Sequence, residues 1–128
     1  MNRSIMSLDI APSEYTPHIY FESAADTLWI KGESYPENAW AFYAPLFEWA
    51  RALVVTKRPL KVCFQLDYLN TSSTKMLLDF LTQLEEYHAV GSSVSLVWYY
   101  QPGIEVMKEA GEDLFEGLTL DCVVQEYP

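Results

Sequence analysis

Hydroxyl side chains are concentrated at one point of the chain, where Thr71, Ser72 and Ser73 follow Asn70. An alternating apolar run ends just before them, and a helical apolar pattern begins just after them. The simplest interpretation is that Thr71 or Ser72 caps the helix, because a side-chain oxygen there can bind free backbone amides. The same position suits a phosphate, since these amides and the positive end of the helix dipole favour negative charge. Thr71 is therefore both a candidate helix cap and a candidate phosphate acceptor.

Phosphorylation of Thr71 would change which surfaces can dock at this point. A phosphothreonine adds about −1.5 to −2 charges at pH 7. The start of a helix tolerates that charge, whereas a partner surface shaped for a neutral hydroxyl does not. This asymmetry predicts a protein-interaction switch.

The flanking sequence predicts the elements that position Thr71. Two short runs rich in aromatic and β-branched residues, 18–22 and 27–31, are separated by a turn-forming segment and indicate a hairpin. Residues 60–68 alternate between apolar and polar side chains, which is typical of a strand with one buried face, and 93–100 and 118–126 indicate two further strands. Helical periods predict helices over about 34–55, 70–89 and 104–115, and the first would start at a capping box formed by Ser34 and Glu37.

The element order β-β-α-β-α-β-α-β predicts an α/β domain with a mixed, mostly parallel five-stranded sheet. A parallel sheet covered on both faces would show continuous apolar runs. The alternation in 60–68 and 93–100 therefore favours helices mainly on one face. We expect residues 1–17 to form a partly ordered lead-in and residues 18–128 to form a single domain.

Two loops should meet at one edge of this sheet, because parallel strands end on the same side. In open α/β sheets this edge is where ligands and partners usually bind. We therefore expect a partner-binding surface next to Thr71. Its candidate residues are Tyr35, Pro36, Glu37, Asn38, Tyr68, Leu69, Asn70, Ser72 and Ser73.

Several motifs of the chain resemble the SiaC family of bacterial regulatory phosphoproteins. The motifs are Ser34-Tyr35-Pro36-Glu37-Asn38, Tyr68-Leu69-Asn70-Thr71-Ser72-Ser73, Leu84-Glu85-Glu86, Val94-Ser95-Leu96 and Ala110-Gly111-Glu112-Asp113. The first two, at this separation, are the specific ones, and the resemblance spans nearly the whole chain. It implies a fold like the anti-sigma-factor antagonist (STAS) domain, which agrees with the element order above.

The resemblance also implies a regulatory role for Thr71. In that family the matching threonine is phosphorylated by a dedicated histidine-kinase-like protein kinase and dephosphorylated by a PPM-type phosphatase. The unphosphorylated form binds a diguanylate cyclase and promotes cyclic di-GMP synthesis, which supports biofilm formation or aggregation. Phosphorylation blocks that binding.

Two other functions fit the sequence less well. One is an anti-sigma-factor antagonist that captures a kinase-type anti-sigma factor. The other is a small enzyme that uses Glu37 and the Thr71 hydroxyl. We expect no metal site, because His18 and His88 lack ligand spacing with a Cys or acidic partner. We also expect no cofactor and no enzyme activity.

The composition narrows the class of partner. The 128 residues carry a formal net charge of −10, which disfavours nucleic acids and anionic lipids as partners.

Cys63 and Cys122 lie in apolar runs and are expected to be buried free thiols. With no secretory signal and no membrane-spanning run, we expect a cytoplasmic protein. Five aromatic residues of the first helix are expected mostly in the core: Trp40, Phe42, Tyr43, Phe47 and Trp49. Five in ten residues exceed what one buried helical stripe holds, so an exposed binding patch formed by some of them is the alternative.

Overall fold

The structure is a computed structural model that describes residues 7–128. Over these residues it contains a mixed six-stranded sheet and three α-helices. The strands are β1 (Asp9–Ile10), β2 (His18–Glu22), β3 (Thr27–Ser34), β4 (Leu60–Leu69), β5 (Val94–Tyr100) and β6 (Asp121–Glu126). The helices are α1 (Ala39–Val54), α2 (Thr71–Ala89) and α3 (Glu105–Phe115), and a short 3-10 helix, η2 (Ser23–Ala25), joins β2 to β3.

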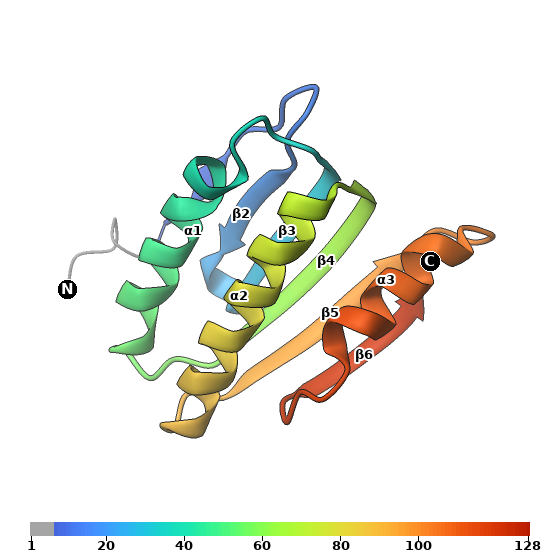
Figure 1. Ribbon diagram of the computed structural model, residues 1–128. Helices are drawn as coiled ribbons and strands as arrows, with labels where there is room; N and C mark the ends of the chain where they lie inside the picture. Colours follow the sequence, from blue (N-terminus) through green and yellow to red (C-terminus); the bar gives the residue numbers. More distant parts are fainter. Residues whose placement is uncertain (1–6) are drawn as a thin grey trace.

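Strands that are neighbours in the sequence are also neighbours in the sheet, whose order is β1-β2-β3-β4-β5-β6. The first three strands pair antiparallel, and β3 to β6 pair parallel. Each parallel connection therefore moves one strand along in the same direction, and α1, α2 and α3 lie side by side on one face (Figure 1). This arrangement confirms the predicted α/β class and the mixed, mostly parallel sheet.

The prediction of five strands was wrong, because β1 adds a sixth. Asp9 and Ile10 pair with Tyr20 and Ile19 of β2. A two-residue strand is too short to show an alternating pattern, so the sequence carried no signal for it. Of the predicted lead-in, 1–17, residues 1–6 lie outside the described residues.

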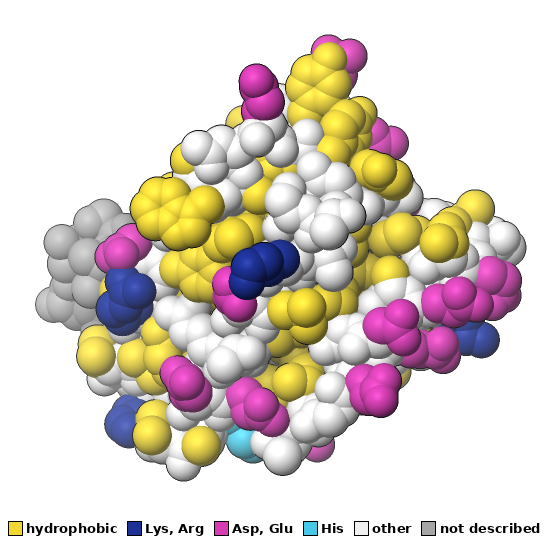
Figure 2. All heavy atoms as spheres, viewed as in Figure 1, with side chains coloured by type: hydrophobic (Ala, Val, Ile, Leu, Met, Phe, Trp, Pro, Cys, Tyr) yellow, Lys and Arg dark blue, Asp and Glu magenta, His cyan; other side chains and the backbone are white. Residues whose placement is uncertain are grey.

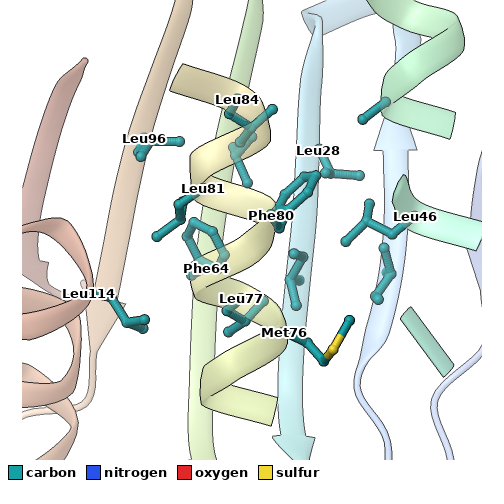
Figure 3. Close-up of a cluster of buried hydrophobic side chains, with 14 of the residues drawn as sticks. Leu28, Leu46, Phe64, Met76, Leu77, Phe80, Leu81, Leu84, Leu96 and Leu114 are labelled. Atoms are coloured by element: carbon teal, nitrogen blue, oxygen red, sulfur yellow. The ribbon is translucent and has the colours of Figure 1, made fainter. Parts of the chain in front are cut away.

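The core lies between the sheet and the helix layer. Val62, Phe64 and Leu66 of β4 are buried on the face that the helices cover, as the alternation predicts. From α2, the buried residues Leu77, Phe80, Leu81 and Leu84 point toward that face (Figure 3). The same helical stripe that predicted α2 therefore fixes which side of the helix faces the sheet.

No helix of residues 7–128 covers the other face of the sheet (Figure 1). The rings of Trp29 and Tyr99 lie nearly parallel there, with centroids 6.0 Å apart, and the Lys31 ammonium lies 4.4 Å from the Trp29 ring centroid.

Cys63 is buried and Cys122 half-buried, both as free thiols, and burial raises the pKa of each. None of the helices in the described part of the chain is long and apolar enough to cross a membrane.

Helix α1 begins later than the sequence predicted. Ser34 does not cap it, because Ser34 is the last residue of β3 and pairs with Leu69 of β4. The helix starts at Ala39, and the Asn38 side chain accepts a hydrogen bond from the Ala41 amide at 3.1 Å. Continued strand pairing therefore overrides the capping-box pattern of Ser34 and Glu37.

Candidate phosphorylation and partner-binding site

The loops after β3 and β4 are neighbours at one edge of the sheet. The Asn70 amide donates a hydrogen bond to the Ser34 carbonyl at 2.9 Å, one step beyond the Ser34–Leu69 pair. Both α1 and α2 begin at this edge (Figure 1). The parallel pairing of β3 and β4 thus brings together the two segments that carry the predicted partner-binding residues.

Asn70 caps α2, which corrects the expectation that Thr71 or Ser72 does so. Asn70 has an extended backbone, and its Oδ1 accepts hydrogen bonds from the Ser73 amide at 2.8 Å and from the Ser72 hydroxyl at 3.3 Å. Asn is among the preferred N-cap residues because its short side chain reaches these amides. Thr71 is consequently the first residue of the helix itself.

The Thr71 side chain is exposed to solvent. Among residues 7–128 its hydroxyl has no hydrogen-bond partner, since Asn70 already performs the capping. The hydroxyl can therefore accept a phosphate without loss of an existing contact, and the phosphate would lie at the positive end of the α2 dipole.

Ser73 differs from its two neighbours because it points into the protein. Its Oγ lies 2.7 Å from the Oγ of Ser34, which in turn lies 2.6 Å from the Tyr43 hydroxyl of α1. All three residues are buried, and burial raises the pKa of Tyr43 to about 12. This chain of hydroxyls joins β3, α1 and α2, and its α2 member, Ser73, is two residues after Thr71. Tyr43 was not among the predicted site residues, because no sequence pattern links three hydroxyls from three separate elements.

Aromatic side chains form the outer part of this edge. The Tyr35 ring contacts Tyr15 and Tyr68 edge-on, with centroid distances of 5.2 and 5.4 Å. The Tyr35 hydroxyl donates to Glu33 at 3.3 Å, and partial removal from water, together with that carboxylate, raises the pKa of Tyr35. Tyr15 and Tyr68 are about half exposed, at 51% and 49%. Tyr15 was not among the predicted residues, because its contact with Tyr35 joins distant parts of the chain.

The predicted partner-binding residues do not all reach the surface. Ser73 and Pro36 are buried, whereas Glu37, Asn38, Tyr68 and Ser72 are exposed. The remaining three, Tyr35, Leu69 and Asn70, are partly buried.

The acidic side chains of Glu33 and Asp67 lie close enough to each other near this edge to interact. Burial and the nearby Glu33 carboxylate raise the pKa of Asp67. Within residues 7–128 no hydrogen bond joins Glu37 to the Thr71 hydroxyl. No cluster of three or more His, Cys, Asp or Glu side chains in the described residues is placed to hold a metal ion.

Comparison with known proteins gives one consistent result. The family model of the SiaC family regulatory phosphoproteins matches residues 10–127. An uncharacterized protein of Pseudomonas aeruginosa is 36% identical over 121 residues, which cover 94% of this chain and 96% of that protein.

Two solved structures from Pseudomonas aeruginosa have the same fold. The crystal structure of the diguanylate cyclase SiaD in complex with its activator SiaC matches with a TM-score of 0.88 and 35% identity, and covers 94% of this chain and 99% of that chain. The crystal structure of apo-SiaC matches with a TM-score of 0.85 and 34% identity, and covers 93% of this chain and 98% of that chain.

Proposed function

Because this chain belongs to the SiaC family of regulatory phosphoproteins, we propose that it is a phosphorylation-controlled switch that binds and stimulates a diguanylate cyclase. In this proposal the unphosphorylated protein promotes cyclic di-GMP synthesis, and thereby biofilm formation or aggregation. A histidine-kinase-like kinase adds phosphate to Thr71, and a PPM-type phosphatase removes it. The chain acts in the cytoplasm through binding and has no catalytic residue of its own, on a scaffold that we describe as STAS-like.

The observation that carries this proposal is the Thr71 hydroxyl, which is exposed and is not used to cap the helix. It lies in the first turn of α2, at an edge that also presents Tyr68, Glu37 and Asn38. A kinase can reach this hydroxyl without unfolding the helix. A phosphate there would add charge and volume to the surface that meets the partner.

A cyclase is favoured over an anti-sigma factor as the partner, because a similar protein, SiaC, has been crystallised in complex with the diguanylate cyclase SiaD, which it activates. The 35% identity covers nearly the full length of both chains.

The test combines a phosphorylation assay with a binding assay. Incubation with the kinase of the source organism and ATP should add one phosphate, and Thr71→Ala should abolish it. Titration calorimetry then measures binding to SiaD of Pseudomonas aeruginosa, or to the equivalent cyclase of the source organism. We expect Thr71→Ala to bind as the unmodified protein does and Thr71→Asp to bind at least about tenfold more weakly, which corresponds to about 1.4 kcal/mol.

Thr82→Asp is the matched control. Thr82 is exposed on α2, eleven residues after Thr71. Eleven residues are about three helical turns, so the added charge is on the same side of α2, roughly 16 Å away. This variant should bind the cyclase normally. Equal binding by Thr71→Asp, Thr71→Ala and the unmodified protein would show that Thr71 does not control the partner.

A further inference from the structure

Three buried hydroxyl groups connect the elements that meet at the edge of the sheet where Thr71 lies. The Ser34 Oγ of β3 lies 2.7 Å from the Ser73 Oγ of α2 and 2.6 Å from the Tyr43 hydroxyl of α1. Ser34 and Ser73 are completely buried, and Tyr43 is 1% exposed. Ser34 is the middle member of this hydroxyl chain, because it contributes to both hydrogen bonds.

Two members of the hydroxyl chain also form a closed ring with the α2 cap. The Asn70 amide donates to the Ser34 carbonyl at 2.9 Å, and the Asn70 Oδ1 accepts from the Ser73 amide at 2.8 Å. Together with the contact between the Ser34 and Ser73 hydroxyls, these bonds hold the start of α2 on the end of β3. Tyr43 is the member that extends the ring to α1.

The first turns of α1 are weakened by Pro45, the seventh residue of a helix that starts at Ala39. Proline has no amide hydrogen, and its ring clashes with the carbonyl four residues earlier, so the Ala41 carbonyl lacks its partner within the helix. The segment before Pro45 therefore depends on contacts with the rest of the protein more than an ordinary helix start does. The Tyr43 hydroxyl supplies such a contact.

The surface formed by the starts of α1 and α2 carries few charges. Residues 38–47 and 68–74 contain no charged side chain. Figure 2 shows acidic side chains gathered over α3 instead. Recognition of an uncharged surface depends mainly on the fit of the two shapes and little on electrostatic attraction. The relative position of the two helix starts therefore matters to a partner that contacts both.

We propose that Tyr43 and Ser34 are positioning residues of the switch, which act through Ser73 to hold the first turns of α1 in a fixed place relative to Thr71. This inference rests on the proposed function and specifies residues that support that same site from inside the protein. A surface that is already in its binding conformation binds more tightly, because less ordering accompanies binding. Loss of a member of the hydroxyl chain therefore weakens cyclase binding, although all three members are buried.

The first test measures the affinity of hydroxyl-deletion variants for the same cyclase used above. Tyr43→Phe and Ser73→Ala each remove one hydrogen bond of the chain and should each weaken binding about threefold, whereas Ser34→Ala removes both and should weaken it about tenfold. Addition of Tyr43→Phe to Ser34→Ala should change the affinity by less than about twofold further, because the residues act as one unit. Circular dichroism confirms that each variant is folded.

Val94→Ala is the matched control for a loss of stability alone. Val94 is 3% exposed at the start of β5 and pairs with Leu60, at the other end of β4 from Leu69. Removal of its buried methyl groups destabilises the core. This variant should still bind the cyclase within about twofold of the unmodified protein, because the folded state remains the main species. Equal weakening by Val94→Ala and Ser34→Ala would reduce the role of Ser34 to fold stability and overturn the inference.

The second test measures the positioning without the cyclase. Amide hydrogen exchange followed by mass spectrometry reports local opening of the backbone. Peptides that cover residues 38–44 should exchange faster in Tyr43→Phe than in the unmodified protein, while peptides from α3 exchange at the same rate in both. Addition of the cyclase should restore the protection of residues 38–44. If exchange in this segment is unchanged in Tyr43→Phe and in Ser34→Ala, the hydroxyl chain does not hold α1 and the inference is wrong.

The two proposals fail in different ways. If the unmodified protein binds no cyclase, or if Thr71→Asp binds as well as it does, the proposed function is wrong and the positioning role falls with it. If binding depends on Thr71 but Ser34→Ala and Tyr43→Phe bind like Val94→Ala, only the positioning role is wrong.

Discussion

Asn70 and Thr71 are adjacent residues with separate tasks at the start of α2. The Asn70 side chain accepts hydrogen bonds that satisfy the free end of the helix, while the Thr71 hydroxyl stays exposed and has no partner among residues 7–128. This separation matters for a modification site, because a phosphate on the capping oxygen would remove the cap. A phosphate on Thr71 leaves it in place.

We predict that this division of tasks appears in stability measurements. Asn70→Ala should lower the free energy of unfolding by about 1 kcal/mol, the typical cost of losing an N-cap. Thr71→Ala should change it by less than about 0.5 kcal/mol, because alanine suits the first helical turn at least as well. Urea unfolding monitored by circular dichroism measures both. If Thr71→Ala lowers the free energy of unfolding more than Asn70→Ala does, Thr71 and not Asn70 caps the helix.

Tyr43 makes the stability of the protein depend on alkaline pH. Its pKa is about 12 in the folded protein because the side chain is buried, and about 10 in an unfolded chain. The unfolded state therefore loses the proton first, so this contribution to stability is complete below pH 10 and is lost as the pH rises toward 12.

We predict that removal of the Tyr43 hydroxyl flattens this loss. Between about pH 8 and about pH 11, the unmodified protein should lose about 1.4 kcal/mol more stability than Tyr43→Phe. Urea unfolding at each pH gives the comparison, and the difference between the two proteins cancels the titration of the other tyrosines and of the lysines. Parallel pH curves for the two proteins would contradict the burial of an ionisable hydroxyl at this position.

At the scale of helices and strands, local pattern determined most boundaries, and tertiary pairing changed the rest. The alternation of 60–68 and the apolar stripe of α2 predicted β4 and α2 to within about two residues, because each has one buried face. The start of α1 was predicted five residues too early, since Ser34 and Glu37 match a capping box while the Ser34 backbone pairs with β4. A short-range pattern does not contain that competing pairing.

The candidate site shows the same limit. The meeting of the loops after β3 and β4, seen in the Asn70–Ser34 hydrogen bond and the Tyr35–Tyr68 contact, followed from parallel strand order alone. The contact of Tyr15 with Tyr35, and the hydroxyl chain through Tyr43, depend on side chains that meet only after folding. Their positions in the sequence therefore carry no signal for either feature.

The packing of α3 on the sheet depends on a glycine. A Cβ built on Gly111 would lie 2.3 to 2.7 Å from three atoms of the Trp98 ring, and Trp98 is completely buried on β5. We predict that Gly111→Ala destabilises the protein by about 1–3 kcal/mol, the usual cost of overpacking a core. Glu112→Ala, an exposed neighbour on the same helix, should change stability by less than about 0.5 kcal/mol. Thermal unfolding compares the two, and equal midpoints would show that α3 can shift away from β5 at little cost.

At the scale of the whole molecule, the distribution of charge opposes folding. The chain has 18 acidic and 8 basic residues, and the salt bridges of the described residues involve only four of the carboxylates. Acidic residues are dense on and just after α3, where Lys108 is the only cation. These acidic residues are Glu105, Glu109, Glu112, Asp113 and Glu116. Folding brings like charges closer together than they are in the unfolded chain, so their repulsion lowers stability.

We predict that salt stabilises the protein by screening this repulsion. An increase from about 0.02 M to about 0.2 M NaCl shortens the Debye length from roughly 20 Å to roughly 7 Å, so the urea midpoint should rise. Glu112→Lys changes the formal net charge from −10 to −8, and this variant should start from a higher midpoint at low salt and gain less from added NaCl. If the midpoint instead falls with NaCl, the four salt bridges outweigh the repulsion, and the acidic surface would then have to be explained by what it binds.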